Sequence, residues 1–342
     1  MYLQNAWYVA AWGHELGDRP LARTILGEPL VLCRSADGVV FALEDRCCHR
    51  NFPLSKGTRV PEGIQCGYHG LTFDHTGRCI HIPGQKVIPP SAAVRAWPVV
   101  EQWRWIWVWM GDPEKADPAR IPDLWMNDDP GWAVSEGDLL RVRGHYQLVI
   151  DNLMDGSHVT FVHKGTLGTD DVADVPVNTE RKGNRVRMVR WILDRPAAPI
   201  YASLGGFTSN VDRWQIITSA PPSTVVVDMG SAVAGTGAPQ GDRSQGIELR
   251  SFNLITPETD QSCFYFYTHV RNFALDSAAV TKRIKDLFRI AFLEDAEVIE
   301  RVQAGNDRYQ GRPLVDAGFD KAPLMTRRVL QRMIRTERAN NC

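Results

Sequence analysis

The chain has 342 residues and a formal net charge of -1, from 39 Lys and Arg against 40 Asp and Glu. This length allows two domains of ordinary size, and the balanced charge gives no indication of a nucleic-acid surface or an anionic membrane partner. The first residues contain no basic segment and no long apolar run. We therefore expect neither a secretory signal nor a membrane-spanning helix, and we expect a cytoplasmic protein.

Residues 21 to about 112 have the pattern of short β-strands. The β-rich runs Arg23–Cys33 and Val39–Glu44 are joined by Asp37-Gly38, a dipeptide typical of hairpin turns. Further along, tryptophans alternate with other residues from Trp103 to Trp109, which is the period of a strand with one aromatic face, and we interpret this face as core packing. The sequence thus predicts an all-β first domain.

Two short loops in this region carry four candidate metal ligands, Cys47 and His49 in the first and Cys66 and His69 in the second. Two thiolates and two imidazoles suit a tetrahedral zinc or a 2Fe-2S cluster whose cysteines hold one iron and whose histidines hold the other. Each loop offers one ligand of each kind, which favours a Rieske cluster over zinc. Cys48 has no counterpart in the second loop, and this favours an oxygenase over a respiratory Rieske protein.

A turn at Gly111-Asp112-Pro113 and a segment rich in proline and aspartate up to Pro130 indicate a domain boundary. We place the first domain at residues 1–112 and the second at residues 113–342. Residues 175 to 270 again have strand-like patterns. The glycines at 235–241 lack the spacing of a dinucleotide fingerprint, so we expect electrons to come from a separate protein.

Two histidines in the second domain, His158 and His163, lie among apolar residues close to Asp151 and Asp155. A mononuclear iron that activates dioxygen takes two imidazoles and one carboxylate on one face. Histidines five residues apart are about 140° apart on a regular helix, so we expect a π-bulge or a helix break near them. The alternative is a pair of buried, hydrogen-bonded histidines without a metal.

The third ligand is expected from an amphipathic helix over Ile284–Val302, whose apolar face comprises Ile284, Phe288, Ala291, Val298, Ile299 and Val302. On a helical wheel Asp295 falls near the middle of the apolar arc and Glu294 toward its edge. A carboxylate in such a place is costly unless it is paired or bound to a metal, so we predict Asp295 as the third ligand, with a buried salt bridge as the alternative. The tail, Leu324–Arg338, has the pattern of a basic amphipathic helix that packs on the domain.

Over essentially its full length the chain resembles the oxygenase component of Rieske non-haem iron oxygenases, in the branch of vanillate O-demethylase, dicamba O-demethylase and toluenesulfonate methyl-monooxygenase. The resemblance implies an α+β fold. An N-terminal all-β Rieske domain would be followed by a helix-grip-like antiparallel sheet with helices that carry a mononuclear iron site. The residues that carry the resemblance are Asn5–Ala10, the paired loops, Asp151–Asp155 with His158 and His163, Leu293–Asp295, and, for the toluenesulfonate enzyme, residues 46–50, 167–170 and 230–241.

The resemblance also implies a homotrimer with a head-to-tail arrangement. In it Asp155 would join His69 of one subunit to His158 of the next, and Asn152 would line the iron pocket. NADH would supply electrons through a flavin and ferredoxin-type reductase, and Fe(II) at the two histidines and Asp295 would react with O2. Asn253 falls where the dicamba enzyme has a substrate-binding histidine, and we take it as a candidate substrate contact.

We therefore expect a monooxygenase that acts on the methyl or methoxy group of an aromatic acid, by toluenesulfonate methyl hydroxylation or vanillate-type O-demethylation. Hydroxylation of the aromatic ring by the same centre is an alternative, because the iron ligands would be shared. A Rieske electron carrier with a purely structural second domain is an alternative of another class. It would hold the cluster irons alone, whereas the oxygenase would hold an additional iron.

Overall fold

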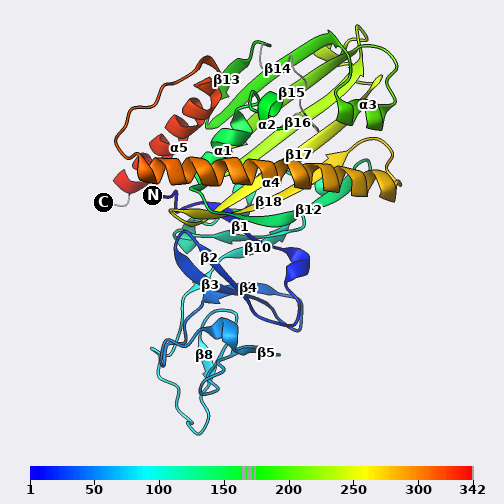
Figure 1. The fold of residues 1–342 in the computed structure, drawn as a ribbon. Coiled ribbons are helices and arrows are strands. Elements are labelled where there is room, and N and C mark those ends of the chain that lie inside the picture. Colours follow the sequence, from blue (N-terminus) through cyan, green and yellow to red (C-terminus); the bar gives the residue numbers. More distant parts are fainter. Residues whose placement is uncertain (164–166, 168–171, 173–174, 341–342) are drawn as a thin grey trace. The chain divides into compact units, whose positions relative to one another are not determined.

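The computed structural model describes residues 1–163, 167, 172 and 175–340 (Figure 1). The chain forms two compact units, Met1–Ile121 with Thr256–Asp260, and Pro122–Ile255 with Gln261–Cys342. The division between residues 112 and 113 stays a prediction from the sequence, and the compact units divide nearby, after Ile121. Residues 168–170, part of the similarity to the toluenesulfonate enzyme, lie outside the described residues.

The first unit consists of three small antiparallel sheets and short 3-10 turns, as an all-β domain requires. The first sheet has the order β1-β11-β10, the second β2-β3-β4-β9 and the third β5-β6-β7-β8. The strands are β1 (Trp7–Trp12), β2 (Leu21–Ile25), β3 (Glu28–Arg34), β4 (Val40–Glu44), β5 (Thr58–Val60), β6 (Gly63–Gln65), β7 (Thr72–Phe73), β8 (Cys79–His81), β9 (Ala96–Trp97), β10 (Val99–Gln102) and β11 (Trp105–Trp109).

Two of the predicted strands differ in detail from the observed ones. The run Arg23–Cys33 is two strands, because Leu26 and Gly27 have φ of 54° and 85° and turn the chain between β2 and β3. Trp103 lies in the turn between β10 and β11 with φ of 55°, so the aromatic strand begins only at Trp105. The tryptophans of β11 are fully buried, which confirms their interpretation as core.

The second unit is built on one seven-stranded antiparallel sheet with the order β12-β18-β17-β16-β15-β14-β13. Its strands are β12 (Ala133–Val142), β13 (Asn178–Lys182), β14 (Arg185–Arg195), β15 (Val211–Ala220), β16 (Thr224–Val233), β17 (Gly246–Thr259) and β18 (Ser262–Arg271). Its helices are α1 (Tyr146–Met154), α2 (Val159–Val162), α3 (Pro199–Gly205), α4 (Ala278–Arg308) and α5 (Lys321–Ala339).

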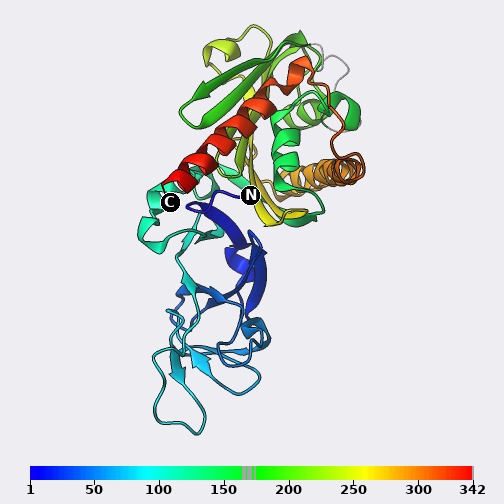
Figure 2. The same ribbon diagram turned by 90° about the vertical axis from the view of Figure 1, so that its left-hand side faces the viewer.

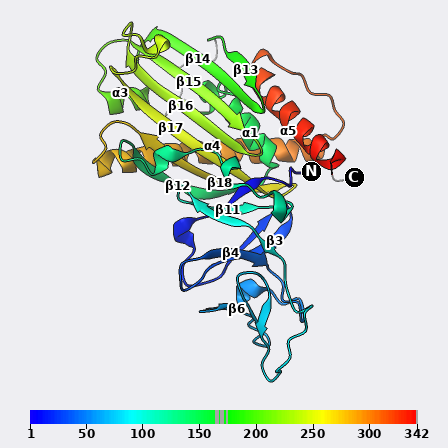
Figure 3. The ribbon, with the colours of Figure 1, turned by 180° about the vertical axis from the view of Figure 1, so that it is seen from behind.

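Helices α1, α4 and α5 cover one face of this sheet, and Figure 3 shows the strands from the opposite side. Figure 2 shows the same helices and sheet turned by 90°. The predicted tail helix is α5, and it packs through buried residues that include Val329, Leu330 and Ile334, as expected. On α4 the apolar face is buried at Ile284 and Phe288.

Two predicted members of the apolar face of α4 are not buried. Val298 and Val302 are 37% and 45% exposed. They line an open groove together with Leu314 and Val315, which are themselves exposed. The expectation of burial was wrong here because nothing in the described part of the second unit covers this end of the helix.

Among the described residues no helix is both long enough and apolar enough to cross a membrane. The glycine-rich segment at 235–241 forms turns and a single 3-10 turn, Ala238–Gln240. An amphipathic helix does not follow it in the described chain, since the next element is β17.

Candidate metal centres and substrate cavity

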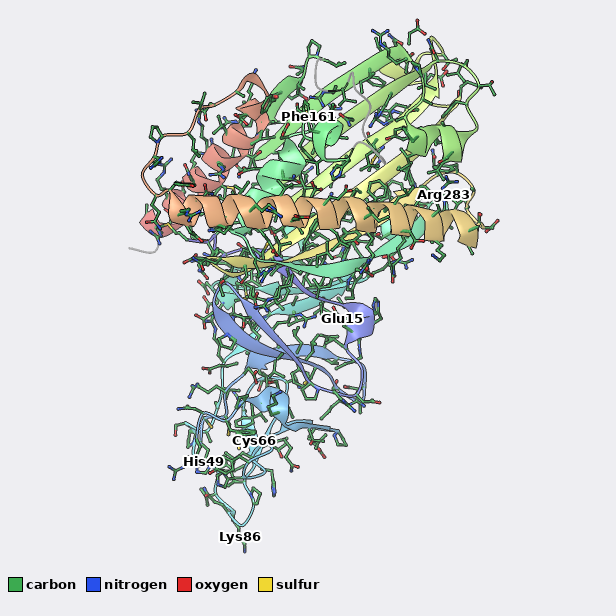
Figure 4. All side chains as sticks on the ribbon, viewed as in Figure 1. Glu15, His49, Cys66, Lys86, Phe161 and Arg283 are labelled. Carbon is green, nitrogen blue, oxygen red and sulfur yellow. The ribbon has the colours of Figure 1, made fainter. Side chains whose placement is uncertain are left out.

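The two histidines predicted as ligands lie at a helix break, as helical geometry required. Helix α1 ends at Met154, Asp155 follows with φ of -98° and ψ of 99°, and the short helix α2 begins at Val159. His158 is the residue before α2 and His163 the residue after it. Phe161, between them, is 67% exposed (Figure 4). The break allows both imidazoles to turn toward α4.

His158, His163 and Asp295 form a candidate metal centre, with one ligand atom of each within 4.8 Å of the others. The Asp295 Oδ1 atom lies 3.1 Å from His163 Nε2 and 3.5 Å from His158 Nε2. Asp295 and His163 are 4% and 2% exposed. Two imidazoles and one carboxylate leave coordination positions open, and this donor set fits a mononuclear non-haem iron.

The outer nitrogens of both imidazoles are held by acceptors. His158 Nδ1 donates to the Asp155 carbonyl, and His163 Nδ1 donates to Glu294 Oε2 at 2.7 Å. Since a carbonyl or carboxylate oxygen can only accept, each Nδ1 carries the proton and each Nε2 keeps its lone pair for a metal. The helical wheel placed Glu294 toward the edge of the apolar arc, and the sequence analysis gave it no role. In the structure it holds the imidazole of His163.

A hydrogen bond from Asn152 holds the Asp295 carboxylate, and the two neighbouring carboxylates act on His163. Asn152 Nδ2 donates to Asp295 Oδ1 at 3.0 Å, which brings α1 and α4 together at the site. Burial lowers the pKa of His163, but Asp295 and Glu294 outweigh this effect and raise its pKa above the ordinary value. A proton and a metal ion thus compete for this imidazole.

Asp155 lies between α1 and α2 with its side chain 20% exposed. Its Oδ1 atom accepts from the Ser157 backbone at 2.7 Å, and its Oδ2 atom is 3.8 Å from His158 Nδ1. Burial raises the pKa of Asp155, but hydrogen bonds with His158 and Ser157 outweigh burial and lower it. Arg190, which sequence reasoning missed, donates to the Gly156 carbonyl at 2.8 Å and to Ser157 Oγ at 2.9 Å, so it fixes this loop from β14.

The two cysteine–histidine loops of the first unit have the same backbone design. The N–H groups of Cys47 and Cys66 each donate to the carbonyl five residues later, both at 2.8 Å. The carbonyls of these cysteines each accept from the N–H four residues later, at 2.9 and 3.1 Å. That fourth residue, Asn51 or Gly70, has a left-handed φ of 56° or 75°. The loops therefore present their side chains in matched ways.

The ligands of these loops are sorted by type. The rings of His49 and His69 are 4.6 Å apart, and the thiol of Cys47 is hydrogen-bonded with that of Cys66. Burial raises the pKa of the Cys47 thiol to about 11. Figure 4 marks His49 and Cys66 in this loop-rich part of the unit. Paired thiols beside paired imidazoles fit a cluster with cysteines on one iron and histidines on the other.

A cavity of about 80 Å³ opens beside the candidate iron ligands within the second unit. Its walls are mostly apolar, which suits one small organic molecule with few polar groups. The apolar lining residues are Leu153, Val159, Leu167, Ile217, Val227, Met229, Phe288 and Phe292.

Asn253, the candidate substrate contact, also lines this cavity and is fully buried. Its Oδ1 atom accepts from Ser251 Oγ at 3.0 Å and from Tyr265 Oη at 2.8 Å. Its amide nitrogen donates to the carbonyls of Val225 and Ser251. The amide is thus already fully hydrogen-bonded by the protein, and its contact with a substrate stays a prediction.

Comparison with known proteins gives two family matches that together span most of the chain. Residues 6–98 match the Rieske 2Fe-2S domain, and residues 142–336 match the vanillate O-demethylase oxygenase C-terminal domain. The iron-sulfur subunit of the toluene-4-sulfonate monooxygenase system from Comamonas testosteroni is 38% identical, over 98% of each chain. The vanillate O-demethylase oxygenase subunit from Pseudomonas sp. strain HR199 is 37% identical, over 98% of this chain and 96% of the relative.

Solved structures give the same result for the fold. A crystal structure of dicamba monooxygenase with non-heme iron and dicamba has a TM-score of 0.86 and 33% identity, and it covers 99% of both chains. The chain thus has the two-domain architecture and the two kinds of metal centre that its residues predicted.

Proposed function

Because the chain belongs to the vanillate O-demethylase family of Rieske non-haem iron monooxygenases, as an oxygenase component, we propose that it oxidises a methyl or methoxy group on a small aromatic acid. One oxygen atom of O2 would enter a C–H bond of that group. A methoxy group would then lose formaldehyde, and an aryl methyl group would become a stable alcohol. The observation that carries the proposal is the small apolar cavity that opens directly on His158, His163 and Asp295.

We assign the cluster to Cys47, His49, Cys66 and His69, and the mononuclear Fe(II) to the two histidines of the second unit with Asp295. When bound, the iron supplies oxygen activation and the cluster supplies single electrons. The chain's own residues orient the metal ligands and shield the cavity from water. Asn152 and Glu294 hold the ligands in position, and Phe288 and Phe292 exclude water from the cavity beside them.

Electrons would come from a separate partner. The relatives are named as subunits or components of multi-component systems, which supports a separate reductase. We propose that this reductase is of the flavin and ferredoxin type and that it draws on NADH.

We also propose that the oxygenase is a homotrimer. In it the partly exposed carboxylate of Asp155 links His158 to the cluster ligand His69 of a neighbouring subunit. The oligomer would be measured by light scattering during size-exclusion chromatography.

The test of the reaction is product mass. The metal-loaded protein would be incubated with a ferredoxin-type reductase, NADH, O2 and a mixture of methyl- and methoxy-bearing benzoates and benzenesulfonates. Gain of one oxygen in a benzylic alcohol, distinguished by fragmentation from an isomeric phenol, identifies a methyl hydroxylase, and loss of a CH2 unit with formaldehyde identifies an O-demethylase. NADH consumption with every compound returned unchanged would contradict the proposed substrate class.

The same assay separates the alternatives. A phenolic product that keeps its methyl group would identify ring hydroxylation, which shares the iron ligands and therefore stays open. The electron-carrier alternative is not supported, because the C-terminal half of the chain belongs to an oxygenase domain family. Iron content provides an independent measurement, since an oxygenase holds an iron in addition to those of its cluster.

A further inference from the structure

Side chains of β15 form one wall of the cavity, and an arginine lies at one end of this wall. Arg213, Gln215 and Ile217 alternate along β15, so their side chains lie on the same face, and all three line the cavity. Their cross-strand neighbours on β16 include Met229 and Val227, opposite Gln215 and Ile217 respectively. This wall of the cavity is therefore apolar at the Ile217 end and polar at the Arg213 end.

The Arg213 guanidinium is buried, and no described carboxylate pairs with it. The residue is 5% exposed, and its Nη2 atom donates to the Leu167 carbonyl at 3.0 Å. Its Nε and Nη1 atoms have no partner among the described residues. The Tyr201 ring lies 5.1 Å from the guanidinium carbon, and its hydroxyl interacts with Arg213 without supplying a negative charge, since burial raises the pKa of Tyr201.

Two other arginines of this unit, Arg243 in the loop before β17 and Arg250 on β17, do have carboxylate partners. Arg243 and Arg250 both pair with Asp228, at 3.0 and 2.7 Å. Asp212, next to Arg213 in the chain, accepts instead from the backbone of Asp194 and Gly235. A buried charge normally has its counter-charge in the protein, and because no described residue supplies one at Arg213, we infer that a ligand does.

Other groups at this end of the cavity add donors and positive charge. Arg190, opposite Gln215 on β14, is 1% exposed and donates to Gln215 Oε1 at 3.1 Å. This bond directs the acceptor of Gln215 toward Arg190, and the amide nitrogen of Gln215 has no partner in the part of the chain that the structure describes. The polar end thus offers N–H donors to an anion.

We propose that Arg213 is the anion-binding residue of the substrate cavity, and that the substrate is an aromatic monoanion whose carboxylate or sulfonate binds this guanidinium. The inference rests on the proposed function, and it names how the acid group of the substrate is recognised. The apolar residues Ile217, Val227, Met229, Phe288 and Phe292 would contact the ring. Asn253 would contribute shape and not a hydrogen bond, because its amide is already engaged.

The test measures binding to the metal-loaded protein by calorimetry without a reductase, so that no turnover occurs. The probes are 4-methylbenzenesulfonate, 4-methylbenzoate and the neutral 4-methylbenzenesulfonamide. We expect the wild type to bind at least one of the two anions more tightly than the sulfonamide, and the stronger anion identifies the preferred acid group. Equal or tighter binding of the sulfonamide by the wild type would overturn the inference without any variant.

Three variants locate the effect. Arg213→Gln should weaken binding of the preferred anion roughly 10- to 100-fold, the loss of a charged hydrogen bond, and leave the sulfonamide unchanged. Arg213→Lys should restore most of the anion affinity. Arg243→Gln removes a guanidinium from the loop before β17, outside the cavity lining, and it should leave anion binding unchanged. Equal weakening of all three probes by Arg213→Gln would overturn the inference.

Failure of this inference can be distinguished from failure of the proposed function. If the reductase-coupled enzyme oxidises methyl arenes but binds them without regard to charge, the function stands and the role of Arg213 is refuted. If Arg213 governs anion binding but no bound anion is oxidised, the anion site stands and the proposed reaction is refuted.

Discussion

The hydrogen bond between Glu294 and His163 allows a quantitative test of how the iron site is supported. Glu294 accepts from His163 Nδ1 at 2.7 Å, and its side chain is 40% exposed whereas that of His163 is 2% exposed. A charged hydrogen bond contributes roughly 1.5–3 kcal/mol, and solvent contact places this one near the lower end of the range. Glu294→Ala should therefore weaken iron binding about tenfold.

A graded series strengthens the test. In Glu294→Gln a neutral oxygen can still accept the bond, and since charge roughly doubles its strength, the loss should be about threefold. Glu297→Ala is the matched control, because Glu297 lies on the same helix, is 66% exposed and pairs with Arg301 at the surface. It should bind iron like the wild type.

The assay is competition for Fe(II) between the protein and a chelator, with the visible absorbance of the cluster as an internal measure of an intact first unit. Wild-type iron affinity in Glu294→Ala would refute the supporting role of this carboxylate. Equal losses in Glu294→Ala and Glu297→Ala would show that helix α4 is destabilised generally and that the hydrogen bond is not responsible.

Three further predictions concern electron transfer, pH and packing. Asp155→Asn should keep both metals and nearly abolish turnover, and a parallel loss of iron would contradict its bridging role. Burial lowers the pKa of His269 to about 3, so between pH 6.5 and 3 the unfolded state binds more protons than the folded state. The free energy of unfolding should therefore decrease as the pH is lowered through this range, by up to about 1.4 kcal/mol per pH unit. His269→Phe should flatten this slope in urea titrations; an unchanged slope would assign it to other groups. Gly230→Ala places a Cβ 2.2 Å from Trp214 and should cost about 1–3 kcal/mol in thermal unfolding, whereas Gly305→Ala, with open space around it, should be neutral or stabilising.

The cluster of His158, His163 and Asp295 could be predicted from the sequence because its constraints are local. A separation of five positions between His158 and His163 is incompatible with one face of a regular helix, and the structure accordingly ends α1 before them. Asp295 is conspicuous because a carboxylate in an apolar arc needs a partner. Both arguments use only helix geometry and the cost of burying charge.

The supporting residues could not be predicted in the same way. Glu294 and Arg190 act on residues far away in the chain, so no spacing marks them. Arg213 lies on β15, where both faces are largely buried, and alternation then gives no sign of which side chains reach the cavity. Trp103 was placed in a strand because its spacing fits, although its left-handed backbone makes it part of a turn.

Strand β17 belongs to both compact units, since residues 256–260 are part of the first and the rest of the strand is part of the second. Leu26 and Gly27 donate their N–H groups to the carbonyls of Pro257 and Glu258, both at 2.9 Å. A Rieske fragment cut after residue 121 would leave these two amides without acceptors. Chimaeras that exchange this domain between relatives should therefore carry residues 256–260 from the same parent as residues 1–121, so the unit of recombination is discontinuous in the gene.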